Sequence, residues 1–171
     1  SQYEHLGIDI NLAGDTGTTP LFIACQNGQV GVVKLLLTRE EIQINLARDS
    51  GATPLSIACQ KGQVGVVRLL LASNQSNYGE IQINQARNDG ATPLYFACQM
   101  DRVDVVKLLL AREDIQINQA KTDGSNPLYI ACHMGRVGVV RLLLARKEIQ
   151  INQDVQGWTP LKIACFNGHV D

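Results

Sequence analysis

A Pro-Leu pair recurs along this chain at a nearly fixed interval. The five prolines are Pro20, Pro54, Pro93, Pro127 and Pro160, and a cysteine stands at the fifth position after each of them. The interval is almost constant, and only the one from Pro54 to Pro93 is clearly longer. A period in this range is the sequence signature of a repeat architecture, in which small units stack into an elongated array. The period therefore constrains the fold more than any other feature of the sequence.

Each period reads as two short helices joined by a tight turn. Thr53 is suited to cap a helix that starts at Pro54, where the missing N–H of proline costs nothing. Gly62 predicts the end of this helix, because glycine enters the left-handed region freely. A second helix is predicted over residues 64–72, and its apolar residues occupy more than one face. One unit cannot cover these faces alone, so neighbouring units have to stack.

The motifs resemble those of the ankyrin repeat family. The matching residues are Asp49-x-Gly51-Ala52-Thr53-Pro54-Leu55, Ala58-Cys59, Gly62, Val66-Val67-x-Leu69-Leu70-Leu71 and Asn84. The resemblance implies an all-α solenoid of antiparallel helix pairs with turn or β-hairpin-like connections. The chain departs from the family pattern at the residue after Pro-Leu. Histidine is common there in the family, whereas this chain has Phe22, Ser56, Tyr95, Tyr129 or Lys162.

The repeat predicts one continuous solenoid with four full units and two partial ones. We expect residues 1–14 to be the tail of a partial repeat and residues 155–171 to be a partial C-terminal repeat. The full units are expected at 15–48, 49–87, 88–121 and 122–154, and the unit at 49–87 carries a five-residue insertion within 73–80. Insertions in such arrays map to surface loops.

Composition and cysteine placement exclude several classes of function. A net charge of -1 offers no field for a nucleic-acid backbone or an anionic membrane, and no apolar run approaches the roughly 20 residues of a membrane span. Cysteines that recur only once in each unit lack the close spacing of metal ligands. Stacked units lie about 8–10 Å apart, beyond the reach of a disulfide. We therefore expect no metal, no cofactor and no enzyme activity.

The cysteines also indicate a compartment. Each stands beside alanine on the helix face expected to pack inward, so we expect five free thiols that all react slowly. Free thiols favour a reducing compartment. We therefore predict that the protein is located in the cytoplasm. The nucleus and the cytosol of a host cell are the alternatives.

Differences between otherwise similar units indicate the surface that is free for recognition. They fall in the turn before each helix pair, at the residue after Pro-Leu and at the two residues after cysteine. Positions four apart share one face of a helix. The resemblance places this face and the turn tips on a concave surface. The predicted partner-binding residues are Phe22, Gln26, Ser56, Gln60, Lys61, Asp89, Tyr95, Gln99, Met100, Asp123, Tyr129, His133, Met134, Trp158, Lys162 and Phe166.

Five of the eight aromatic residues lie in these columns, namely Phe22, Tyr95, Tyr129, Trp158 and Phe166. Aromatic residues dominate the hot spots of protein interfaces. We therefore expect a non-catalytic recognition scaffold that binds a protein or peptide on its concave face. Two alternatives stay open. Some of the rings can simply fill space between helix and turn, and the chain can be an engineered or consensus-derived scaffold, or a spacer from a longer array, without a dedicated partner.

Overall fold

The computed structural model describes residues 9–73 and 79–169, so most of the expected insertion, residues 74–78, lies outside the described residues. The described part of the chain is helical. Its helices are α1 (Pro20–Gln26), α2 (Val30–Leu36), α3 (Pro54–Lys61), α4 (Val64–Ala72), α5 (Pro93–Gln99), α6 (Val103–Leu110), α7 (Pro127–His133), α8 (Val137–Leu144) and α9 (Pro160–Phe166). The predicted helix over residues 64–72 corresponds to α4.

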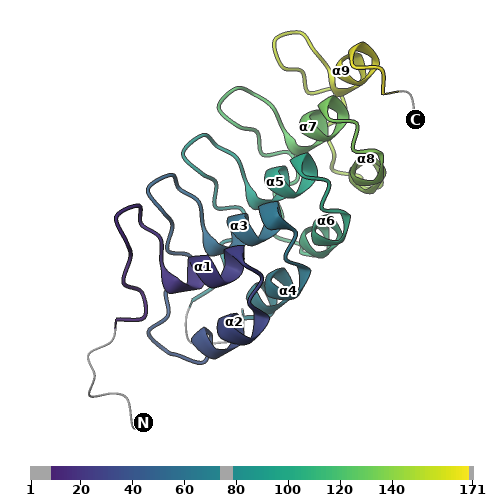
Figure 1. Cartoon of the computed structure of the whole chain (residues 1–171). Coiled ribbons are helices and arrows are strands. Elements are labelled where there is room, and N and C mark those ends of the chain that lie inside the picture. Colours follow the sequence, from purple (N-terminus) through teal and green to yellow (C-terminus); the bar gives the residue numbers. More distant parts are fainter. Residues whose placement is uncertain (1–8, 74–78, 170–171) are drawn as a thin grey trace.

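The helices form two parallel rows (Figure 1). The inner row contains α1, α3, α5, α7 and α9, and the outer row contains α2, α4, α6 and α8. Each helix contacts the next one in its own row, and each outer helix contacts the inner helix that precedes it. Hairpin-like loops project from the inner row on the side away from the outer row. The predicted all-α solenoid of helix pairs is confirmed.

The inner helices begin at the residues that the sequence marks as caps. The side chains of Thr19, Thr53, Thr92, Asn126 and Thr159 each accept a hydrogen bond from the backbone N–H three residues on. A proline follows each of these residues. The cap satisfies one of the N–H groups that a helix start leaves unpaired, and the proline removes another. Local chemistry therefore fixes where every inner helix starts.

A residue in the left-handed region follows each inner helix, and after α1, α3, α5 and α7 it turns the chain toward the outer row. Four of these residues are glycines, Gly28, Gly62, Gly135 and Gly168, with φ between 63° and 75°. The fifth is Asp101, with φ of 55°. A residue with a Cβ is strained in this region, although aspartate tolerates it better than most.

Replacing Asp101 with glycine is expected to stabilise the array by up to about 1 kcal/mol, because the left-handed strain disappears. The melting temperature measures the effect. The reciprocal change Gly62→Asp is the matched control and should lower it, since a Cβ at Gly62 would lie 2.7 Å from Arg102 Cδ at a φ of 75°. A lower melting temperature for Asp101→Gly would contradict the strain argument.

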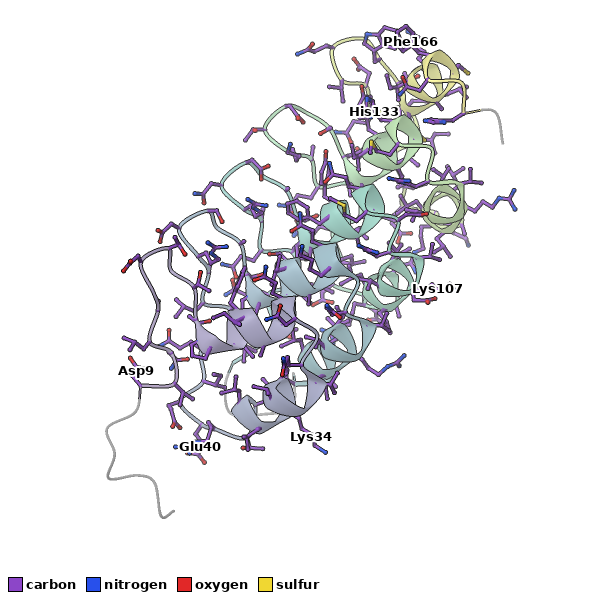
Figure 2. All side chains as sticks on the ribbon, viewed as in Figure 1. Asp9, Lys34, Glu40, Lys107, His133 and Phe166 are labelled. Carbon is purple, nitrogen blue, oxygen red and sulfur yellow. The ribbon has the colours of Figure 1, made fainter. Side chains whose placement is uncertain are left out.

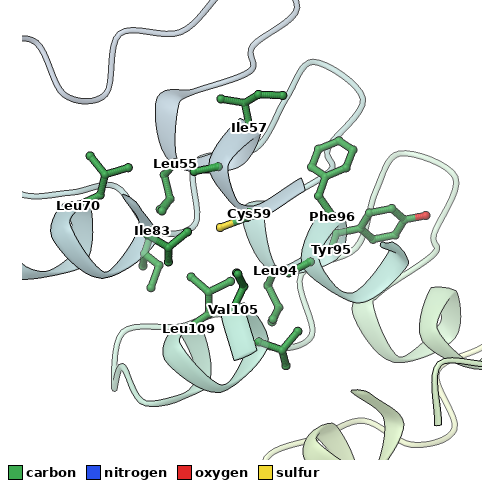
Figure 3. Close-up of a cluster of buried hydrophobic side chains, with 14 of the residues drawn as sticks. Leu55, Ile57, Cys59, Leu70, Ile83, Leu94, Tyr95, Phe96, Val105 and Leu109 are labelled. Atoms are coloured by element: carbon green, nitrogen blue, oxygen red, sulfur yellow. The ribbon is translucent and has the colours of Figure 1, made fainter. Parts of the chain in front are cut away.

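The core runs the length of the array, from Leu21 to Leu143. Figure 3 shows its middle part, where side chains of α3, α4, α5 and α6 meet. The leucine of each Pro-Leu pair is buried in the first four inner helices, at Leu21, Leu55, Leu94 and Leu128. The valines and leucines of the outer helices pack against these residues. Burial of apolar area at about 25 cal/mol per Å² is the main force that holds such units together.

Two side-chain ladders tie successive helix pairs together. In the first, an asparagine bonds two backbone groups of the next pair: Asn45 Nδ2 donates to Glu80 O at 2.9 Å, and Asn45 Oδ1 accepts from Gln82 N at 2.9 Å. Asn11, Asn84 and Asn118 repeat this arrangement. In the second, Gln63, Arg102, Arg136 and His169 each bond a carbonyl of the last two residues of the preceding inner helix, at 3.1–3.2 Å.

Candidate functional site

The surface between the inner helices and the hairpin-like loops carries most of the predicted partner-binding residues. We call this surface the inner face. Nine of the predicted residues are exposed: Lys61, Asp89, Met100, Asp123, His133, Met134, Trp158, Lys162 and Phe166. Four are half-buried: Gln26, Gln60, Gln99 and Tyr129. All of them lie in an inner helix, directly after one, or in the loop that precedes one.

Three of the predicted contact residues, Phe22, Ser56 and Tyr95, are buried instead, and this corrects the sequence-based expectation. Each lies in the first turn of an inner helix, and a basic residue of the following loop lies over Phe22 and over Tyr95. Arg48 lies over the Phe22 ring at 5.1 Å, and the hydroxyl of Ser56 donates to Thr53 O at 2.9 Å. Tyr95 is only 4% exposed. The space-filling interpretation therefore holds for Phe22 and Tyr95.

Methionines supply the apolar part of the inner face in its middle. Met100 caps the C-terminus of α5 and Met134 caps α7, and each is 38% exposed. An unbranched, polarizable side chain adapts to partners of different shape, which suits methionine to binding surfaces. Met100 and Met134 directly follow inner helices. Lys107, by contrast, lies in the outer helix α6 (Figure 2).

Aromatic side chains supply the part of the inner face nearest the C-terminus. Trp158, in the last loop, meets Phe166 of α9 edge to face, with ring centroids 5.2 Å apart. Phe166 is 73% exposed. In α7 the Tyr129 ring stacks on His133 at 6.3 Å. Exposed rings that neighbouring rings already hold in place would lose little entropy on contact with another molecule.

A cavity of about 250 Å³ opens on the inner face beside α7. Helix residues Tyr129, Ile130 and His133 form one side, Val155 and Gln156 of the last loop form another, and the rest of the lining is Tyr95, Asp123 and Ser125. The lining combines aromatic, carboxylate, hydroxyl and amide groups. Such a mixture suits recognition of a side chain that has both an apolar stem and a polar end.

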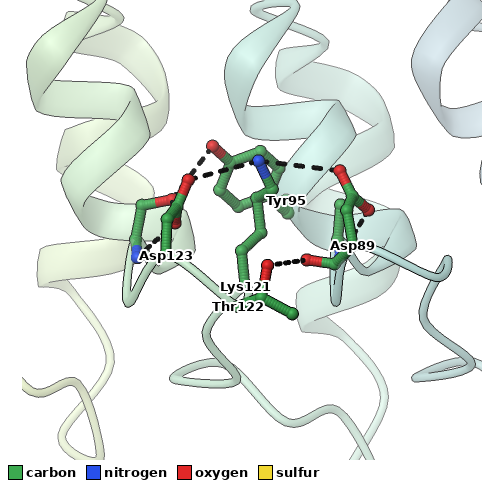
Figure 4. Close-up of polar contacts among 7 residues, drawn as sticks. Asp89, Tyr95, Lys121, Thr122 and Asp123 are labelled. Carbon is green, nitrogen blue, oxygen red and sulfur yellow. Dashed lines mark hydrogen bonds and ion pairs between the residues drawn. The ribbon is translucent and has the colours of Figure 1, made fainter.

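A cluster of polar contacts next to this cavity centres on the half-buried Lys121 (Figure 4). Its Nζ lies 5.4 Å from the centroid of the Tyr95 ring, 3.6 Å from Asp89 Oδ2 and 3.4 Å from Asp123 Oδ2. The Tyr95 hydroxyl lies 3.3 Å from Ser125 Oγ. The cation thus sits over a ring and between two carboxylates.

The protonation of these groups follows from their neighbours. The hydrogen bond from the Ser125 hydroxyl holds the pKa of Asp123 below its usual range, and Lys121 adds to the effect. Burial raises the pKa of Tyr95, although its hydrogen bond with Ser125 and the charge of Lys121 oppose this. Asp123 is therefore a carboxylate and Tyr95 a neutral phenol at neutral pH. The cluster is a set of fixed charges and not a proton relay.

Lys121, Val155 and Gln156 contribute to this region but are not among the residues predicted from the sequence. A basic residue precedes each middle turn, at Arg48, Arg87 and Lys121, and Val155 breaks the series. The last loop is also one residue shorter, and backbone bonds between Val155 and Trp158 close it around Gln156, which has φ of 52°. The signals that could have revealed these residues are the recurring basic position and the shortened interval from Pro127 to Pro160.

A second cavity, of about 490 Å³, is largely apolar and lies between α7, α8 and α9. It occupies the place where the other inner helices contact an outer helix, since no outer helix follows α9 within residues 9–73 and 79–169. Leu161 and Cys165 line it and are exposed. The expectation that all five cysteines pack inward is therefore wrong for Cys165.

The other thiols are in settings that suppress reactivity. Cys25, Cys59 and Cys98 are buried and Cys132 is half-buried, and all five cysteines are free. Burial raises the pKa of Cys25 to about 12 and that of Cys132 to about 11, and it also raises the pKa of Cys59 and Cys98. Only a thiolate is an effective nucleophile, so these four are packing residues. Within the described residues, no group of three or more His, Cys, Asp or Glu could hold a metal ion.

The comparison with protein families agrees with this geometry. A family model described as ankyrin repeats in three copies matches residues 3–81, 51–121 and 112–171. The chain belongs to the ankyrin repeat family. Ankyrin repeats are generally protein-protein interaction modules, and domains built from them are generally non-catalytic binding scaffolds.

The search of curated proteins found no match. Among the helices in the described part of this ankyrin repeat chain, none has the length and apolar character that a membrane crossing requires.

Proposed function

We propose that this ankyrin repeat chain is a non-catalytic recognition scaffold that binds a partner protein or peptide through its inner face, and that this face is the concave side of the solenoid. The observation that carries the proposal is the exposure of Met100, Met134, Trp158 and Phe166 along one row of helices. Large apolar side chains that are exposed together mark interaction sites on proteins.

Polar residues around these side chains support the same conclusion. Gln60, Lys61, Gln99 and His133 lie at the C-terminal ends of the inner helices, and Asp89 and Asp123 lie in the loops. An interface core of aromatic and methionine side chains with a polar rim is typical of protein-protein contacts. The free cysteines suit a reducing compartment, and we propose that the chain acts in the cytoplasm or nucleus.

Single changes on the inner face are expected to weaken binding of a purified partner by roughly 1–3 kcal/mol, because hot spots carry most of an interface's energy. The variants are Tyr129→Ala, Met134→Ala and Trp158→Ala. None of them removes a fully buried side chain. Calorimetry measures the affinity, and circular dichroism checks that helicity is kept.

The controls for this experiment lie on the outer row. Lys107 and Arg141 are exposed residues at equivalent positions of α6 and α8, and changing either to alanine should leave the affinity almost unchanged. A partner whose binding survives all three inner-face changes, but is lost on charge reversal at Lys107 and Arg141, would place recognition on the outer row instead.

A further inference from the structure

We propose that the cavity beside α7 accepts a basic side chain, arginine or lysine, presented by the partner. This inference rests on the proposed function, because it names the chemistry that one part of the inner face recognises. The observation behind it is a series of internal ring–cation contacts that is complete at α1 and α5 and lacks its cation beside α7.

The series pairs an aromatic ring with a cation from the next loop. Phe22 is the third residue of α1, and Arg48 lies over its ring at 5.1 Å. Tyr95 holds the same position in α5, and Lys121 lies over it at 5.4 Å. Arg48 and Lys121 are equivalent, since the N–H of each donates at 2.9 Å to the carbonyl that closes its loop, Ala52 O and Ser125 O. A cation over an aromatic face is attracted by the ring quadrupole.

The unit between these two shows what happens when one member is missing. Ser56 has no ring, and the equivalent cation Arg87 lies instead over Phe96 at 5.1 Å. Three loops have a basic residue at this position, and in all three the basic residue lies over an aromatic ring.

Beside α7 the ring is present and the cation is missing. Tyr129 is the equivalent of Tyr95, and Val155 is the equivalent of Lys121, because the N–H of Val155 donates at 2.9 Å to the closing carbonyl, here Trp158 O. Valine is too short and carries no charge. The space is the 250 Å³ cavity lined by Tyr129, Asp123, His133, Val155 and Gln156.

The charge around the cavity is favourable to a cation. Asp89 and Asp123 carry two negative charges, and Lys121 balances only one of them. Each aspartate directly precedes the glycine of its turn, so Asp123 has the same position relative to the cavity that Asp89 has relative to Lys121. Gln156 offers an amide oxygen in place of the second carboxylate. A basic side chain would lay its stem against Val155 and the Tyr129 ring and its charged end toward Asp123.

Three acetylated pentapeptides test the proposal, with arginine, lysine or citrulline between glycines and serines. Citrulline keeps the shape of arginine without its charge. Backbone amide shifts of the full chain are followed by NMR. We expect arginine or lysine to shift Asp123, Tyr129 and Gln156, with citrulline roughly 2- to 30-fold weaker, the range of a cation–π contact.

Val155→Lys provides the decisive variant, because it supplies the missing cation from within the chain. It should abolish the shifts caused by the basic peptides while leaving the melting temperature unchanged or higher, because Lys121 at the equivalent position of the previous loop lies over a ring and beside a carboxylate. Val155→Thr is the neutral control and should bind as the parent does. Equal shifts for citrulline, no shift with any peptide, or undiminished shifts in Val155→Lys would overturn the inference. None of these results would decide whether a partner binds through Trp158 and Met134, because the alanine variants of the inner face test that separately.

Discussion

Leu94→Ala is expected to lower the free energy of unfolding by about 2–5 kcal/mol, the usual cost of a leucine-to-alanine cavity in a packed core. Leu94 has 0% exposure and lies in the cluster between α5 and the outer row (Figure 3). The total free energy of unfolding of an ordinary domain is only about 5–15 kcal/mol, so this single change removes a large share of the stability. Urea-induced unfolding followed by circular dichroism measures it.

The chain supplies a matched control for this experiment. Leu161 is the equivalent leucine of the last Pro-Leu pair, and it is 72% exposed because no outer helix covers α9 in the described part of the chain. Leu161→Ala removes the same atoms but should change the stability by less than about 0.5 kcal/mol. Similar losses for the two variants would contradict the assignment of the core to the space between the rows.

Thiol labelling of the native protein is expected to separate the cysteines by on the order of a thousandfold or more in rate, since a buried thiol reacts only after the structure opens. Cys165 is exposed and should react first, with the half-buried Cys132 next. Cys25, Cys59 and Cys98 should react last, because burial blocks access and raises their pKa values. Mass spectrometry of peptides from time points identifies each site.

The denatured protein provides the reference rates for labelling. In denaturant all five thiols should react alike, because none is then buried. A native Cys59 or Cys98 that reacts as fast as Cys165 would contradict the packing of the inner helices.

Local chemistry made the helices predictable. Thr53, Pro54 and Gly62 specify where α3 starts and stops through groups that lie close together in the sequence, and the predicted bounds of α4 are those observed. The left-handed conformation of Asp101 followed from the glycines at equivalent positions. Such features depend on capping and backbone sterics, which a single unit already contains.

The exposure of individual site residues was harder to predict, because it depends on groups in the neighbouring unit. Tyr95 and Tyr129 have the same place in their helices, yet Lys121 of the next loop covers the first and Val155 leaves a cavity beside the second. Cys165 follows its proline as the other cysteines do, but nothing in the described residues buries it. Only the packing of neighbouring units decides these cases.

The methyl groups of Met100 and Met134 offer the most direct test of binding through the inner face. They are the only methionines of the chain, and both lie at the ends of inner helices with 38% exposure. Selective ¹³C labelling of their ε-methyl groups gives two NMR signals that both report on this face. When a partner is added to saturation, we expect both signals to shift or broaden. Two unchanged signals with the partner fully bound would contradict recognition through the inner face.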